Sequence, residues 1–229
     1  LLTPFMSCTA KMAIYGFFVE AFFPNHGVVV MLSLYLLGIL VGLLTAIVRK
    51  HLGHKYKPSP FVMEIPVYRL PSLSNVGHLL WDKMKDFISS AMTVILIATI
   101  AIWALRSFSW NLSFVEDSSQ SIMAYVSGLI APIFEPIGLG DWRIITSLIS
   151  GLMAKEGVVA TMGMLGAEDA LTVVTAVPML IFCLLYTPCA AALTAIGREL
   201  GRRWAWYVAF FQCIVAWGVA WIGYIVALW

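Results

Sequence analysis

Residues 28–48 read VVVMLSLYLLGILVGLLTAIV, a stretch of 21 residues without a charged side chain. A helix that crosses the hydrocarbon core of a bilayer needs about 20 mostly apolar residues. The stretch therefore predicts a transmembrane helix, and it sets the fold class for the rest of the chain.

The composition of the whole chain agrees with a membrane protein. Hydrophobic residues make up 61% of the 229 residues and charged residues 11%, and the mean hydropathy is +0.92. A soluble domain carries about 25% charged residues, so lipid must cover most of the outside of this protein. The net charge of +2 gives no indication of a nucleic-acid partner, and none is expected.

The same length criterion finds several further apolar segments. Strong candidates lie near 28–48, 87–105, 143–164, 171–196 and 204–228, and weaker ones at 5–23 and 121–137. The expected fold is all-α: a polytopic transmembrane helix bundle of about six to seven spans, with broken or re-entrant helices where charge, glycine or proline interrupts a span.

Basic residues set the expected orientation, because Lys and Arg concentrate in cytoplasmic loops. They cluster in 49–57, at 83–85 and at 198–203. Segment 49–86 is therefore expected in the cytoplasm, with an amphipathic surface helix over 75–86. The cluster at 198–203 returns to the cytoplasm if 121–137 crosses the membrane, which we favour; a re-entrant 121–137 would leave it outside.

The chain accordingly divides into three expected parts. Residues 1–48 hold the first two membrane segments, 49–86 form the cytoplasmic loop and surface helix, and 87–229 form a transmembrane bundle. Because the chain opens on Leu1 instead of Met, we expect a piece of a longer protein, cut at both ends.

Lys155 and Glu156 lie in the middle of the predicted span 143–164. A charge at the bilayer centre costs about 2.5–3.5 kcal/mol on insertion scales, so it faces a partner or a cavity. Either the two residues pair with other helices as structural contacts, or the helix is broken and Glu156 meets a cation.

Soft donors precede the second membrane segment. On a helix, Cys8 and Met12 would share one face, and Met6, Ser7 and Lys11 lie beside them in the sequence. A thiol and a thioether suit a transition metal better than sodium or magnesium. The alternative is that both are ordinary packing residues.

A second cysteine follows a predicted helix break. Pro188 interrupts the segment 171–196, because proline removes a backbone donor and clashes with the preceding turn. Unwound backbone beside a cavity is how transporters build ion sites, and Cys189 would lie at that break; an ordinary proline kink is the alternative. Cys183 and Cys213 are expected to be packing residues.

Five short motifs together resemble the membrane domain of the bacterial ferrous iron transport protein B family. In chain order they are PFMSC at 4–8 with Lys11, FVMEIP at 61–66 with YRLP at 68–71, WDK at 81–83 with DF at 86–87, GLMAKE at 151–156, and YTPC at 186–189.

The resemblance implies import of Fe²⁺ into the bacterial cytoplasm by a multi-pass protein of the inner membrane. It implies that this chain is the carboxy-terminal part, with the second gate segment. An amino-terminal GTP-binding domain, which would use GTP and Mg²⁺, and a first gate segment would lie outside it. The small proteins FeoA and FeoC are implied as partners, and a homo-oligomer is possible within such a family.

The same resemblance points to site residues. Cys8 and Cys189 match the positions of gate-segment cysteines proposed to line the pore, and we hypothesise that Glu156 converges with them on a transient metal site. Lys155, Pro188, Glu64 and the residues around Cys8 would support it.

Two other function classes stay open. The bundle could carry an organic solute such as a nucleoside, or it could anchor a GTPase without transporting anything. An enzyme is not expected, because the sequence has no P-loop, no G-x-G-x-x-G motif and no histidine cluster.

Overall fold

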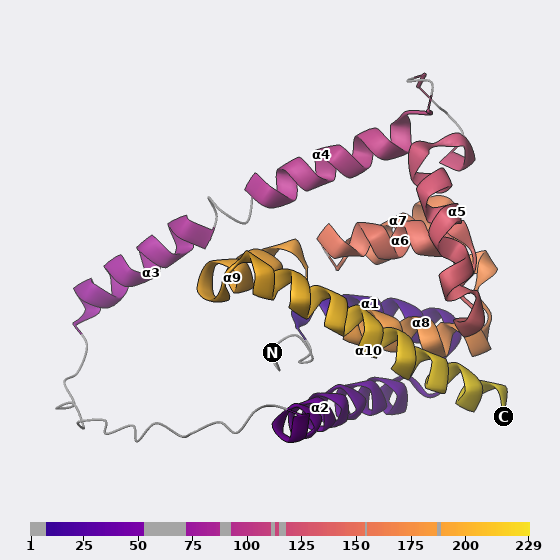
Figure 1. Ribbon diagram of the computed structural model, residues 1–229, viewed down its shortest axis with the longest axis horizontal. Helices are drawn as coiled ribbons and strands as arrows, with labels where there is room; N and C mark the ends of the chain where they lie inside the picture. Colours follow the sequence, from indigo (N-terminus) through magenta and orange to yellow (C-terminus); the bar gives the residue numbers. More distant parts are fainter. Residues whose placement is uncertain are drawn as a thin grey trace.

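The computed structural model describes residues 8–52, 72–87, 93–110, 113–114, 118–153, 155–186 and 189–229 (Figure 1). Regular structure in these residues is helical, apart from one isolated bridge between Phe108 and Phe114. The all-α prediction is confirmed. The elements are α1 (Thr9–Phe22), α2 (Gly27–Leu52), α3 (Leu73–Phe87), α4 (Thr93–Ser107), η3 (Ser118–Gln120), α5 (Ile122–Phe134), η4 (Glu135–Ile137), α6 (Trp142–Met153), α7 (Gly157–Leu165), η5 (Ala167–Ala170), α8 (Val173–Leu185), α9 (Ala190–Leu200) and α10 (Arg202–Leu228).

The predicted number of spans is not confirmed. Among the described residues, two helices are long and apolar enough to cross a membrane: Gly27–Val48 within α2, and α10. A third span results if η4 and α5 count together with α6, from which they are bent by 102°. The count falls because the segments 143–164 and 171–196 are each divided into two shorter helices.

Apolar side chains cover the outward faces of both long helices. Leu36, Ile39 and Leu43 on α2 are more than half exposed, as are Phe210 and Ile214 on α10. Exposed apolar surface of this extent is typical of contact with lipid. These faces support the assignment of α2 and α10 to the membrane.

Helix α8 forms the centre of the bundle. Its residues from Pro178 to Leu185 are buried, and it packs against α10, α1 and α2 (Figure 1). A capping box between Thr172 and Thr175 begins the helix, because each side chain accepts or donates a bond that the first turn would otherwise lack. Gly223 on α10 lies directly against the side chain of Ile181, which lets the two helices approach closely.

The weaker segment 121–137 forms α5 and η4. Gly138 ends it with φ +75°, a left-handed conformation that favours glycine. In Figure 1, α5 runs at a steep angle to α4, α6 and α10. It therefore does not extend in the direction that the other long elements share.

The predicted surface helix is confirmed as α3, and its described side chains are largely exposed, including Leu79, Leu80 and Trp81. Its contact with the membrane surface stays a prediction. Glu64 and the motifs around it lie outside the described residues.

Candidate functional site

Helices α6 and α7 form an antiparallel hairpin where the sequence predicts one continuous span. Arg143 near the start of α6 donates a hydrogen bond to the carbonyl of Gly166 after the end of α7, at 3.1 Å. Further along, Gly151 lies against Val158, and Gly157 lies against the backbone of Ser150. Because these pairs bring the two arms of the hairpin together, the chain enters and leaves it at the same end, and the predicted single crossing over 143–164 is not confirmed.

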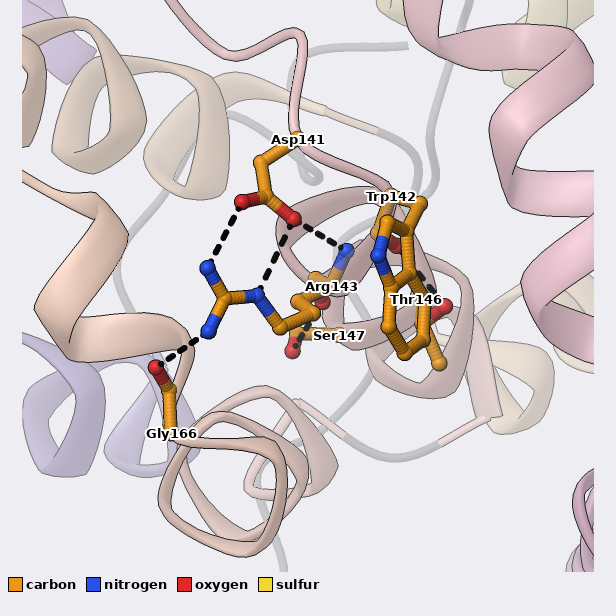
Figure 2. A network of polar contacts seen from close by, with 6 residues as sticks. All are labelled: Asp141, Trp142, Arg143, Thr146, Ser147 and Gly166. Carbon is orange, nitrogen blue, oxygen red and sulfur yellow. Dashed lines mark hydrogen bonds and ion pairs between the residues drawn. The ribbon is translucent and has the colours of Figure 1, made fainter. Parts of the chain in front are cut away.

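An ion pair closes the open end of the hairpin (Figure 2). The Arg143 guanidinium donates to both carboxylate oxygens of Asp141, at 2.9 and 3.3 Å, while its other terminal nitrogen donates to Gly166. Arginine's planar fork suits such simultaneous contacts. On the opposite side of α6, the hydroxyls of Thr146 and Ser127 lie 2.8 Å apart and join α6 to α5.

Lys155 lies at the tip of the hairpin and points into the protein. Its side chain is 3% exposed, and its ammonium nitrogen lies 3.2 Å from the centre of the Tyr186 ring. A cation over an aromatic face is stabilised by the ring's quadrupole, most strongly where water is excluded. Glu156, in contrast, is exposed and directly precedes α7. Of these two adjacent residues, Lys155 alone is buried.

Tyr186 belongs to the second interruption of the chain. It follows α8 in an extended conformation, stacks on Phe182, and its hydroxyl lies 3.5 Å from the carbonyl of Leu148 on α6. The helix ends here because Pro188 follows in the sequence, although Pro188 itself lies outside the described residues. Cys189 is half-buried and directly precedes α9.

The third interruption is the start of α1. Cys8 is exposed and directly precedes the helix. Lys11 and Tyr15, which share a face, are buried, whereas Met12 is 41% exposed on a different face. The protein interior is therefore contacted by Lys11 and Tyr15, and not by the predicted face of Cys8 and Met12. Met6 and Ser7 lie outside the described residues.

These three interruptions meet. Lys11 and Lys155 each interact electrostatically with the same three thiols, those of Cys8, Cys183 and Cys189. Contacts of α1 with α7 and α8, and of α6 with α9, hold the segments together. This part of the bundle thus holds the buried residues Lys11, Lys155, Cys183 and Tyr186, while Cys8 is exposed and Cys189 half-buried at the helix starts.

Cys183 is fully buried on α8 among the hydrophobic core residues. This position agrees with the expectation that it is a packing residue.

Cys8, Glu156 and Cys189 share one structural feature. Each occupies the position directly before a helix, and none of the three side chains makes a capping hydrogen bond. The described residues contain no group of three His, Cys, Asp or Glu side chains close enough to hold a metal ion, so Glu156 and the two cysteines do not form such a group in this conformation.

A cavity of about 470 Å³ lies between α4 and the hairpin. Its lining includes Arg106 and Ser107 at one end, the hairpin residues Met153 and Gly157, and Ser150. The Ser150 hydroxyl is buried and has no hydrogen-bond partner within the part of the chain that the structure describes; a buried hydroxyl of this kind is often satisfied by water or by a ligand.

Comparison with known proteins defines the class of protein first. A family model described as "Nucleoside recognition", the gate model, matches residues 88–203, and another described as "Ferrous iron transport protein B C terminus" matches residues 31–83. The chain is thus a helical membrane protein of the gate type. It belongs to the ferrous iron transport protein B family.

Individual relatives agree with this assignment. The chain is 34% identical over 96% of its length to the Fe(2+) transporter FeoB of Methanocaldococcus jannaschii. It is 31% identical over 98% of its length to that of Salmonella typhimurium, and 30% identical over 99% to that of Escherichia coli. It spans 35%, 37% and 38% of these relatives, respectively, and corresponds to their carboxy-terminal part. No solved structure matches it significantly.

Proposed function

We propose that this chain forms part of the membrane path of a protein that imports Fe²⁺ into the bacterial cytoplasm. The observation that supports the proposal is that Cys8 and Cys189 each lie directly before a helix at an interruption of the chain, in a bundle where α1 contacts α8 and α6 contacts α9. Fe²⁺ accepts sulfur, nitrogen and oxygen ligands. Interrupted helices near the middle of a bundle supply such ligands in transporters.

Cys8 and Cys189 are the proposed metal ligands, as thiolates. A thiolate ligand offsets the positive charge of the metal that it binds. Glu156 is the proposed carboxylate of the path; since it is exposed, it would meet the metal before or after the cysteines, at the hairpin tip. The metal is held transiently, because a transport site must also release it.

The hairpin gives the protein a membrane topology that satisfies the positive-inside rule without a crossing at 121–137. Segment 49–86 stays cytoplasmic and α4 crosses outward. The α5 helix remains at the outer side, and the hairpin enters and returns there. Helices α8 and α9 then bring the basic cluster 198–203 back to the cytoplasm. The sequence predicts one crossing at 121–137 and another at 143–164. If neither segment crosses, the basic cluster 198–203 still lies on the cytoplasmic side.

In this topology the cavity between α4 and the hairpin would open toward the outer side. Arg106 and Ser107 lie at its outer end, and Met153 and Gly157 lie next to the hairpin tip. The unpartnered hydroxyl of Ser150 would contribute an oxygen to a hydrated ion in passage. The cavity is therefore the proposed outer route to the cysteines.

The rest of the proposed machinery lies outside this chain. GTP and Mg²⁺ would act through an amino-terminal GTP-binding domain that gates or drives passage, and a first gate segment would complete the path. FeoA, FeoC and further copies of the same protein are the proposed partners, in a multi-pass protein of the inner membrane.

Uptake of ⁵⁵Fe²⁺ into proteoliposomes that contain the full-length protein tests the proposal. Cys8→Ser and Cys189→Ser should each reduce uptake at least about tenfold, because the loss of one thiolate ligand should weaken a soft site by about 1.4 kcal/mol or more, which is a factor of about ten. Cys213→Ser is the control for the loss of a cysteine, because Cys213 lies within the long helix α10 and not at a chain interruption. Uptake that is equal for all three variants would refute the proposed ligands.

A second candidate function is transport of a nucleoside-like solute. The description of the gate model favours it. The amide of Gln212 on α10 also favours it, because it is buried and neither its nitrogen nor its oxygen has a hydrogen-bond partner among the described residues. Such an unpaired amide could bind a base edge. The test is uptake of radiolabelled uridine or adenosine by the full-length protein. Uptake that competes with Fe²⁺ and that falls in Gln212→Leu would support this function over iron transport.

If this chain is a non-transporting anchor, substitution of the proposed path residues should leave the activities of the full-length protein unchanged. If Glu156→Ala and Cys189→Ser leave both GTP hydrolysis and Fe²⁺ uptake of the full-length protein intact, the anchor role is favoured.

A further inference from the structure

We propose that the cavity between α4 and the α6–α7 hairpin binds a phospholipid, with the lipid phosphate at Arg106 and an ester carbonyl of its glycerol at the Ser150 hydroxyl. This inference goes beyond the proposed iron transport, because lipid binding does not depend on transport. Only the choice of leaflet rests on the proposed topology, in which the cavity opens toward the outer side.

The cavity follows one face of each of two helices. Its lining residues on α4 and α7 recur at the spacing i, i+3, i+4 and i+7, which belongs to one side of a helix. On α4 this series runs from Thr99 to Arg106. On α7 it consists of Gly157, Ala160, Thr161 and Met164. Since seven residues of an α-helix extend over about 10 Å, the cavity is an elongated groove, and its volume of about 470 Å³ lies within the range of ligand sites, about 300–1,000 Å³.

Arg106 places a cation at one end of this groove. The residue is half-buried in the last turn of α4, and its two terminal nitrogens donate to the Met164 sulfur at 3.7 and 3.8 Å. A thioether sulfur is a weak acceptor, and no carboxylate in the described part of the chain forms an ion pair with this guanidinium. The hydroxyl-bearing residues Ser107 and Ser118 also line the cavity. A guanidinium with hydroxyls beside it suits the oxygens of a phosphate group.

Ser150 places a second donor at the other end. The residue is 6% exposed and lies against Gly157, seven residues along α7 from Met164. Its hydroxyl has no hydrogen-bond partner among the described residues, although buried polar groups are nearly always paired. A free phosphate ion at Arg106 would leave this hydroxyl unpaired. The two donors therefore fit two acceptors of one longer molecule.

The groove is apolar between its ends and borders an apolar surface. Ile102, Trp103 and Ala160 line it, and α4 carries exposed apolar side chains, among them Ile97 and Ile100. Exposed apolar surface of this kind is typical of contact with lipid, and basic pockets between membrane helices bind lipid head groups. A phospholipid supplies a phosphate, ester oxygens and apolar chains together, whereas a soluble phosphate supplies no apolar part.

The proposed lipid has a consequence for the proposed function. The same cavity is the proposed outer route for Fe²⁺, so a bound lipid and a passing ion would exclude each other. Release of the lipid would then have to precede entry of the ion. This consequence rests on the proposed function, and the lipid binding itself does not.

The test is native mass spectrometry of the full-length protein in detergent, titrated with phosphatidylglycerol in the absence of iron. Arg106→Gln should weaken binding of the most tightly held lipid about tenfold or more, because hydrogen bonds from a cation to the phosphate are lost. Arg106→Lys keeps the charge and should bind at an intermediate level. Arg203→Gln is the control for the loss of an arginine, because Arg203 is exposed at the start of α10 and does not line the cavity.

A pair of serines on α6 separates lipid binding from folding. Ser150→Ala should weaken lipid binding about fivefold, through the loss of one neutral hydrogen bond, and should melt no lower than the native protein after lipid is removed, because its hydroxyl is then unpaired. Ser147→Ala is the matched control. Its hydroxyl donates to the Arg143 carbonyl at 2.9 Å, so this variant should melt lower and bind lipid like the native protein.

Three outcomes would overturn the inference. The first is equal lipid binding by Arg106→Gln and Arg203→Gln. The second is equal binding of phosphatidylglycerol and diacylglycerol, which lacks the phosphate. The third is displacement of the lipid by excess inorganic phosphate in the native protein but not in Arg106→Gln, which would make the free ion the ligand. None of these measurements involves iron, so failure of the proposed iron transport leaves the inference standing, and its own failure leaves iron transport standing.

Discussion

Gly151 is the position at which a single methyl group should disturb the site most directly. A β-carbon added there would overlap the hydroxyl of Tyr186 and a methyl group of Val158. The tyrosine cannot easily move away, because its ring is 2% exposed, stacks on Phe182 and carries the Lys155 ammonium on its face. Gly151→Ala should therefore push the ring out of place or separate the two arms of the hairpin.

The expected cost follows from these contacts. Overpacking of a filled interior costs about 1–3 kcal/mol, and a displaced ring loses a desolvated cation–π contact worth up to about 2 kcal/mol. The intrinsic preference of helices for alanine over glycine offsets about 1 kcal/mol of this destabilisation. The net destabilisation should be about 0–4 kcal/mol, with about 2 kcal/mol as the central value, and each kcal/mol lowers the melting temperature by about 2–4 °C in a domain of this size.

Gly163 on α7 offers a matched control in the same hairpin. A β-carbon at Gly163 meets no atom within 4 Å, so Gly163→Ala should be neutral or stabilising by up to about 1 kcal/mol. The assay is thermal unfolding of the full-length protein in detergent, followed by intrinsic fluorescence, with Fe²⁺ uptake measured on the same preparations. Gly151→Ala combined with Tyr186→Phe should recover part of the loss, because the phenol oxygen is one of the two clashing groups. Equal stability of Gly151→Ala and Gly163→Ala would refute the packing described between the hairpin and Tyr186.

Two further predictions concern the framework of the site. In Arg143→Lys, the lysine cannot bind Asp141 through two parallel bonds and also reach the carbonyl of Gly166. Because the ion pair is partly exposed, this substitution should destabilise the protein by about 1 kcal/mol. An unchanged melting temperature would contradict the role of the Asp141–Arg143–Gly166 contacts at the open end of the hairpin. Thr172→Ala removes the capping box of α8 and should cost about 1 kcal/mol, whereas Thr172→Ser should retain most of the stability; equal melting temperatures for the two variants would contradict the cap.

The interruptions of the chain could be predicted from the sequence. Pro188 marks the end of α8 because proline cannot continue a helix, and the adjacent charges of Lys155 and Glu156 mark the hairpin tip because charge is costly inside an apolar helix. The helix over 73–87 was predictable for a related reason: its apolar and charged residues alternate with a helical period.

The pairing of the interrupted segments was not predictable in the same way. Residues 143–164 have the length and hydropathy of one span, and two antiparallel arms of half that length have the same composition. Only contacts between distant residues, such as Arg143 with Gly166, distinguish the two arrangements. Such contacts depend on packing, and a hydropathy pattern does not contain them.

The inward direction of the charged side chains was also beyond sequence reasoning. Adjacent residues on a helix point about 100° apart, so one of Lys155 and Glu156 had to face away from the site, and the pattern favours neither. The structure directs Lys155 inward.

X-ray absorption at the iron edge of the Fe²⁺-loaded full-length protein tests the central claim most directly. If the three interruptions form the metal path, iron–sulfur scattering should be present in the native protein and in Cys213→Ser, and it should fall in both Cys8→Ser and Cys189→Ser. Bound iron with oxygen and nitrogen neighbours alone, or a sulfur signal that both variants keep unchanged, would contradict it.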